Sequence, residues 1–201
     1  MLRLNLINFN NEKEIMNSYC IPFTPINGGN VLTGQDVDAV LFAKRLTRNS
    51  SFVAIVIDGV TNIAGSAFRR CINLRSIELS EDLVNIGEGA FFYCGNLQSI
   101  ELPEDLVSIS TYVFMECRNL RSIELPKSLV SIGNYAFAFC ASLQSVFFKG
   151  NSKTTPPTIG VGAFSNINSD CEFYVPNDSY IKPLLNSNSG INEDNIIIGK
   201  P

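Results

Sequence analysis

IGEGAFFYCGNLQSIELPEDLVS, residues 86–108, is one of four segments that align without gaps along this chain of 201 residues. The other three begin at Ile63, Ile109 and Ile132, which sets a period of 23 residues. A partial fifth copy begins at Ile159, after an insertion of four residues. Copies in phase at a fixed period indicate a solenoid, in which each copy forms one turn and stacks on its neighbours.

Three of the copies contain the stretch SIEL, in which polar and apolar side chains alternate. This is the two-residue period of a β-strand with one buried face. A single strand cannot bury its face alone, so we expect the strands to pair in parallel, about 4.7–4.9 Å apart, from turn to turn. Every full copy has a phenylalanine three residues before a cysteine, as in Phe91 and Cys94. This spacing predicts a short helical turn on the opposite face.

The repeated unit I-G-x-x-A-F-x-x-C-x-x-L-x-S-I-x-L-P-x-x-L-V-S resembles the BspA-type, or treponemal-type, leucine-rich repeat family over about residues 51–182. The resemblance implies an α/β repeat fold: a short right-handed leucine-rich-repeat solenoid of about five turns, with a parallel sheet on one face and short helical turns on the other. It also implies a secreted or cell-surface protein that binds other proteins or adheres to them, without a conserved catalytic site. The opening MLRLNLINFNNEKE lacks the pattern of a signal peptide, so an intracellular interaction scaffold stays open as an alternative.

The sequence outside the full copies predicts a cap at each end. Residues 1–33 are an N-terminal extension without an assigned role, in which LRLNLINF is a candidate edge strand. Residues 34–50 are the N-terminal cap, with an amphipathic helix expected over 34–47. The solenoid is expected over 51–175, with its first strand at Ile55, Val56 and Ile57. Residues 176–201 are the C-terminal cap, with a short helix opened by Asn177 or Asp178 and a final strand in NIIIGKP.

The composition excludes several classes of function. Histidine is absent, which excludes Ser-His-Asp and Cys-His relays and any zinc site that needs histidine. The net charge of −4 gives no basic footprint for nucleic acid, and no run of 18 apolar residues predicts a membrane span. A glycosidase that uses the repeated glutamates is conceivable, but a flat column offers no pocket to separate their pKa values. We therefore predict no enzyme, no catalytic residue, no cofactor and no metal.

The outward positions of the expected strands form the candidate binding face. Glutamates recur once per copy and end at a phenylalanine, and a second column alternates arginine and glutamine. Two interpretations stay open, a solvated face or the surface that binds a host or neighbouring protein. The oligomeric state is not predicted, and assembly with copies of the same chain is the alternative to a foreign ligand. The candidate residues are Arg75, Glu78, Gln98, Glu101, Arg121, Glu124, Gln144 and Phe147.

Cysteines and aromatic residues give two further candidate clusters. The column of Cys71, Cys94, Cys117 and Cys140 contains no local pair for zinc, so we interpret it as core filling. Cys20 and Cys171 lie outside the column and pair only if the fold brings them together. Five aromatic residues of the turns are either an exposed contact surface or packing between turns, namely Phe92, Tyr93, Tyr112, Tyr135 and Phe139.

Overall fold

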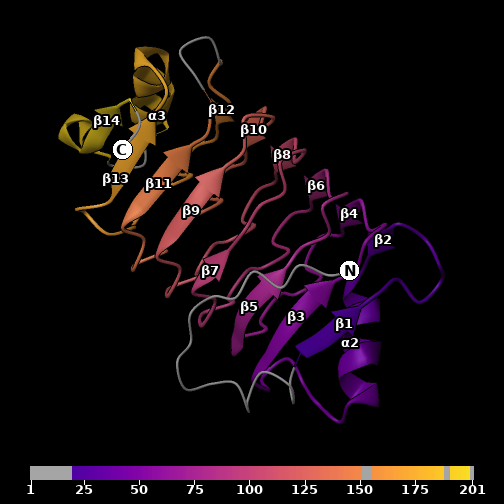
Figure 1. Ribbon diagram of the computed structural model, residues 1–201. Helices are drawn as coiled ribbons and strands as arrows, with labels where there is room; N and C mark the ends of the chain where they lie inside the picture. The colour runs from indigo at the N-terminus through magenta and orange to yellow at the C-terminus, as the bar shows by residue number, and fades with distance from the viewer. Residues whose placement is uncertain (1–19, 151–154, 188–190, 200–201) are drawn as a thin grey trace, which may run out of the picture.

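The computed structural model describes residues 20–150, 155–187 and 191–199, which form a parallel β-solenoid of about six turns (Figure 1). One wall, here called the front sheet, consists of two four-stranded parallel sheets that follow each other along the solenoid. The first contains β1 (Cys20–Phe23), β3 (Phe52–Val56), β5 (Leu74–Glu78) and β7 (Ser99–Ile100). The second contains β9 (Ser122–Leu125), β11 (Ser145–Phe148), β13 (Glu172–Val175) and β14 (Ile196–Ile198).

A second wall, here called the flank sheet, is a single parallel sheet of six two-residue strands. Each of its strands follows a front strand along the chain, after a short loop. The inward isoleucine or leucine side chains of these strands pack in the same core as those of the front sheet. The strands are β2 (Val31–Leu32), β4 (Asn62–Ile63), β6 (Asn85–Ile86), β8 (Ser108–Ile109), β10 (Ser131–Ile132) and β12 (Thr158–Ile159).

The core is organised by a continuous stack of phenylalanine rings. Neighbouring rings are nearly parallel, with centroids 5.2–5.4 Å apart. Phe23 and Phe173 close the stack edge-on at its two ends, with interplanar angles of 80° and 84°. The stacked rings are Phe68, Phe91, Phe114, Phe137 and Phe164. The cysteine column lies in the same core, as the spacing predicted, and Cys94, Cys117 and Cys140 each donate a thiol hydrogen bond to a phenylalanine carbonyl of the preceding turn.

The segments that return from the flank sheet to the front sheet are consecutive reverse turns, not the helical turns expected from the Phe-x-x-Cys spacing. Phe92 and Cys94 donate backbone hydrogen bonds three residues back. Phe91 and Tyr93, in contrast, donate to carbonyls of the next turn, at 2.9 and 3.0 Å. Because alternate N–H groups leave the segment, an α-helix cannot form there. A reverse turn still brings residues three apart to one side, and the expected inward positions are therefore kept.

The N-terminal end contains one turn more than the sequence suggested. β1 pairs with β3 and β2 pairs with β4, so residues 20–32 belong to the solenoid instead of an undefined extension. Helix α2 (Gly34–Ala43) follows and is shorter than the expected 34–47. It begins at a capping box in which Thr33 and Asp36 bond to each other's backbone N–H groups. The candidate strand LRLNLINF lies outside the described residues.

The expected first strand, Ile55 to Ile57, was placed wrongly. In β3 the inward residues are Phe52, Ala54 and Val56, whereas Ile55 faces outward beside Glu78. A register shift between Phe52 and Val53 accounts for the one residue by which this turn is shorter than the full copies. Because alternate residues face opposite sides of a sheet, a shift of one residue reverses the inward and outward assignment.

The guanidinium of Arg48 caps backbone carbonyls at the start of the first full copy. Its Nη1 donates to the carbonyls of Ala67 and Arg69, both at 2.9 Å, and its Nη2 donates to the carbonyl of Gly34 at 3.1 Å. In the next turn the equivalent carbonyls, of Ala90 and Phe92, accept backbone N–H groups of the preceding turn. The guanidinium therefore replaces donors that a preceding turn would supply.

The C-terminal end is closed by short helices and the final strand. η1 (Asp178–Tyr180) and α3 (Ile181–Asn186) follow β13, and η2 (Glu193–Asn195) leads into β14, which pairs with β13. The final strand expected in NIIIGKP is therefore confirmed. Tyr180 is buried, and its hydroxyl donates to the carbonyl of Thr155 at 3.2 Å. Cys171 lies at this end and Cys20 at the other, and all six cysteines of the chain are free thiols.

Candidate binding face

The outward side chains of the front sheet form a straight column across the strands. Ile55 is in register with Glu78, and Glu124 is in register with Phe147. The three glutamates of the column are exposed. From the N-terminal to the C-terminal end the column contains Pro22, Ile55, Glu78, Glu101, Glu124, Phe147, Tyr174 and Ile197. Its centre is therefore acidic and both of its ends are apolar.

A second column runs beside the first and contains the remaining candidate residues, all of them exposed. Backbone hydrogen bonds connect these residues from turn to turn. The N–H of Gln98 donates to the carbonyl of Arg75 at 3.2 Å, and the N–H of Arg121 donates to the carbonyl of Gln98 at 3.2 Å. Gln144 continues the row with a bond to the carbonyl of Arg121 at 2.8 Å. The structure thus places the eight residues selected from the sequence on one face.

A lysine from a neighbouring loop balances part of the acidic charge of the face. Lys149 forms ion pairs with Glu124, at 3.1 Å, and with Glu104, at 2.7 Å. Hydrogen bonding to Glu104, with a smaller contribution from Glu124, raises the pKa of Lys149. Within the described ranges no ion pair joins Arg121 to Glu124, and none includes Glu78 or Glu101. Both of these carboxylates are exposed.

An aromatic pair forms the C-terminal part of the column. The rings of Phe147 and Tyr174 stack with centroids 4.6 Å apart and an interplanar angle of 10°. The hydroxyl of Tyr174 donates to the carboxylate of Glu172 at 2.5 Å, and this bond raises the pKa of the phenol. Tyr174 and Ile197 were missed in the sequence because the insertion before residue 159 breaks the phase. The alternation in EFYV (residues 172–175) is the signal that could have located Tyr174.

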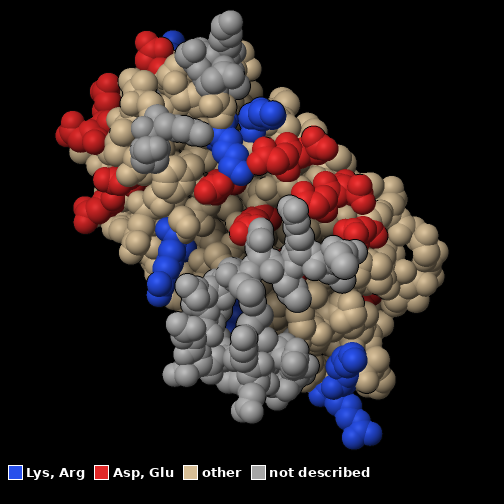
Figure 2. Space-filling model, in the orientation of Figure 1, with Lys and Arg blue, Asp and Glu red and all other residues tan. Residues whose placement is uncertain are grey.

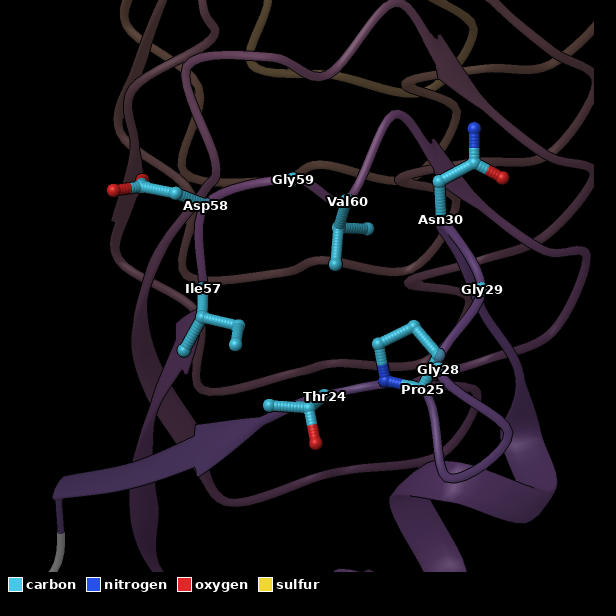
Figure 3. A pocket seen from close by; sticks show the side chains of 9 residues that line it. All are labelled: Thr24, Pro25, Gly28, Gly29, Asn30, Ile57, Asp58, Gly59 and Val60. Carbon is cyan, nitrogen blue, oxygen red and sulfur yellow. The ribbon is translucent and has the colours of Figure 1, made fainter.

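A hollow of about 360 Å³ lies near the N-terminal end of the front sheet, between the loop after β1 and the loop after β3 (Figure 3). Pro25, Ile57 and Val60 give it an apolar lining, and the carboxylate of Asp58 points away from its centre. The glycine-containing loop from Thr24 to Asn30 forms the other side. The sequence did not predict this hollow because residues 20–33 had not been assigned to the solenoid.

The loops that join the front sheet to the flank sheet carry a group of acidic side chains. Figure 2 shows them as a band over the row of loops, with basic side chains towards its C-terminal end. Within the part of the chain that the structure describes, no three histidine, cysteine or acidic residues are grouped to hold a metal ion. No helix in that part is long and apolar enough to cross a membrane.

Comparison with known proteins agrees with this architecture. A family model described as BspA type leucine rich repeat region, in six copies, matches residues 43–170. No curated protein matches the chain. Among solved structures, the T. pallidum leucine rich repeat protein TpLRR is 31% identical with a TM-score of 0.54, and the match covers 65% of this chain and 61% of that one.

Two further solved structures have the same fold. A leucine rich cell surface protein from Faecalibacterium prausnitzii is 32% identical with a TM-score of 0.51, and the match covers 58% of this chain and 31% of that one. The pneumococcal vaccine antigen PcpA is 23% identical with a TM-score of 0.57, over 74% of this chain and 42% of that one, a likeness of fold alone. The matched region thus spans 61% or less of each of these three chains.

Proposed function

This chain belongs to the BspA-type leucine-rich repeat family, and from that premise we propose that it is a non-enzymatic protein-binding module at or outside the cell surface. The front sheet is the surface through which it binds. The observation that carries the proposal is the outward column, which aligns acidic and apolar side chains along the front sheet. Parallel pairing fixes the spacing of these side chains before a partner arrives, which reduces the ordering cost of binding.

The contacts available on this face define the partner as a protein surface. Glu78 and Glu101 are exposed acceptors for basic or amide groups of a ligand. Phe147 and Tyr174 are half-buried and supply apolar area, and aromatic residues of this kind dominate the energetics of many interfaces. A location at or outside the cell surface is supported by the likeness to the Faecalibacterium protein, whose name describes it as a cell surface protein.

The arrangement of the glutamates favours binding over catalysis. Glu78, Glu101 and Glu124 are exposed on a sheet, where water reaches each carboxylate. General acid and base catalysis by two carboxylates needs environments that push their pKa values apart, usually by burial of one of them. None of the three carboxylates is buried in this way, which supports a module without catalytic activity.

The experiment is a pull-down from host-surface and extracellular-matrix extracts with wild type and with Glu78→Lys, Glu101→Lys and Glu124→Lys combined. The matched control is Asp170→Lys, Asp178→Lys and Glu193→Lys, which changes the net charge equally at exposed positions away from the column. We expect a partner that wild type and control retain and the folded column variant loses. A partner bound equally by all three proteins would contradict the assignment of this face.

A further inference from the structure

The reverse turns contain two positions per copy at which the backbone is left-handed. The first is occupied by Ser66, Gly89, Tyr112, Tyr135 and Gly162, and the second by Arg70, Tyr93, Glu116, Phe139 and Asn166, with φ between 54° and 65°. This conformation favours glycine and tolerates asparagine, while other side chains adopt it at a cost. Glycine or asparagine at some of these positions shows that the turn needs no larger side chain there.

Four of these left-handed positions nevertheless hold aromatic residues. Tyr93, Tyr112, Tyr135 and Phe139 each have 37–38% of their surface exposed. Tyr112 and Tyr135 stack on each other, with centroids 5.8 Å apart, so packing between turns accounts for part of their environment. The exposed remainder is not explained by the fold, and backbone strain held by exposed side chains is typical of functional surfaces.

Arginines make this aromatic surface cationic. The guanidinium of Arg69 lies 5.0 Å from the ring centre of Phe92, and that of Arg70 lies 6.0 Å from the ring centre of Tyr93. Of the two acidic side chains in these turns, Glu116 is paired with Arg118 at 2.7 Å and Glu88 is exposed, so the two arginines leave a net positive charge. Tyrosine and arginine are the residues most enriched at the energetic centres of protein interfaces. This surface, the turn face, consists of Arg69, Arg70, Tyr93, Tyr112, Tyr135 and Phe139.

On the opposite side of the solenoid, three successive loops are acidic, and the next loop contains Lys127. Loops lead from the front sheet to the flank sheet, and the reverse turns lead back, so loops and reverse turns occupy opposite sides of the solenoid. The acidic band of Figure 2 covers the loops. This surface, the loop edge, consists of the exposed residues Asp58, Glu81, Asp82, Glu104 and Asp105. The carboxylate of Glu104 is paired with Lys149, and that of Asp82 accepts the N–H of Gly59, which leaves Glu81 and Asp105 as the residues to vary.

We propose that the turn face of one copy of this chain packs against the loop edge of a second copy. The arginines of the turn face and the carboxylates of the loop edge have opposite charge, and the turns that carry both surfaces follow one another at about 4.8 Å, so the two surfaces run parallel when two copies lie side by side. Each copy contacts one neighbour through its turn face and another neighbour through its loop edge. Such a heterologous contact joins many copies into rows. The front sheet stays accessible in such a row, so this inference does not depend on the proposed ligand.

The test is sedimentation of the full chain, up to about 500 μM, at about 50 mM and about 500 mM salt. We expect association that increases with concentration at low salt and disappears at high salt. Arg69→Glu with Arg70→Glu, and separately Glu81→Lys with Asp105→Lys, should each weaken association at least about tenfold, because each leaves like charges opposed. An equimolar mixture of the two variants should associate again, since each now complements the other.

A matched control is Lys44→Glu with Arg45→Glu, an adjacent pair of exposed bases outside the turn face. This control should associate as wild type does. The proposal is overturned if wild type stays monomeric at the highest concentration in low salt. It is equally overturned if the control weakens association as much as the turn-face variant, or if the mixture of variants stays monomeric. Circular dichroism of each variant verifies that the solenoid is folded.

Discussion

The thiol of Cys117 donates a hydrogen bond to the carbonyl of Phe91, one turn earlier, over 3.3 Å. The same bond recurs from Cys94 to Phe68 and from Cys140 to Phe114, at 3.2 Å in both cases. Each of these carbonyls also accepts the backbone N–H of the cysteine three residues later, so the thiol adds a second hydrogen bond to it in the core. A cysteine column is thus a way to fill a narrow core position and to satisfy a backbone oxygen with one small side chain.

Thiol reactivity provides the first prediction. Cys20 is exposed, and the other five cysteines are buried. Burial raises the pKa of the thiols of Cys94, Cys117 and Cys140 well above the ordinary value, which suppresses the reactive thiolate. We expect a thiol reagent to modify Cys20 alone in the native protein at pH 8, and all six cysteines in urea. Modification of a second thiol without loss of structure would contradict this.

Stability at alkaline pH follows from the same burial. Desolvation raises the pKa of Cys71 and Cys171 to about 12, from 9.0 for an exposed thiol. In the unfolded chain these thiols lose their protons near pH 9, while in the native protein they keep them until about pH 12. The native state therefore binds more protons in this interval, and the free energy of unfolding falls as pH rises from about 9 to 12.

Urea unfolding at several pH values tests this dependence. The free energy of unfolding should not decline through these thiols below about pH 9, where the thiols of the unfolded chain keep their protons. The decline above this pH should be shallower in Cys71→Ala than in wild type, which separates the thiol contribution from that of tyrosine and lysine. An equal slope in both proteins would assign the decline to other groups.

The inward and outward positions of the front sheet give a paired prediction. Ile100 is buried at 6% exposure, while its neighbour Glu101 is exposed. Ile100→Asp places an unpaired charge in the core and should reduce the free energy of unfolding by about 3–5 kcal/mol. Glu101→Lys should change it by less than about 0.5 kcal/mol. Thermal melts of the two variants check this, and equal losses would mean that the strand faces are assigned wrongly.

Substitution of Arg48 should open the N-terminal end of the solenoid locally. Arg48→Met keeps the aliphatic stem but leaves the carbonyls of Ala67 and Arg69 without their charged donor. We expect a loss of about 1–3 kcal/mol, with faster amide hydrogen exchange confined to residues 64–71. Arg121→Met, at an exposed position of the front sheet, is the control and should leave exchange unchanged.

The close approach of successive turns gives a prediction at Gly133. A Cβ at this position would lie 2.4 Å from the backbone nitrogen of Thr111, so Gly133→Ala forces the two turns apart. Ser110, which occupies the equivalent position one turn earlier, already has a longer bond between turns: 3.3 Å to Ile86, against 2.8 Å from Gly133 to Ile109. We expect a loss of about 1–3 kcal/mol for Gly133→Ala in chemical unfolding. Gly29→Ala, in open space, should be close to neutral.

Much of this architecture was predictable because the SIEL alternation and the 23-residue period constrain each other. Together they located the inward columns, the parallel front sheet and the eight residues of the candidate face. The helical interpretation of Phe91 and Cys94 failed because residues three apart also share a side across a reverse turn, and spacing alone cannot distinguish the two conformations. Hydrogen bonds to the next turn decide between them, and these are not visible in one copy of the repeat.

The ends were less predictable, since the period carries no information there. The first turn lacks the repeated residues, so β1 and β2 had no signal beyond a few apolar positions. The register shift between Phe52 and Val53 displaced the first strand from the expected position at Ile55 to Ile57. The hollow next to Ile57 and the ion pairs of Lys149 depend on loops of different turns, which a sequence pattern does not bring together.

The guanidinium of Arg48 occupies the carbonyls to which a further turn would bond, and so it sets where the array begins. The cores of the copies between this residue and the C-terminal end pack on the copy before and the copy after. Loss or duplication of one whole copy in that interval joins surfaces that already fit each other, and both ends are preserved. The length of the array is therefore free to change in evolution by whole copies of 23 residues, and the ring stack also continues from Phe137 to Phe164 across the insertion of four residues.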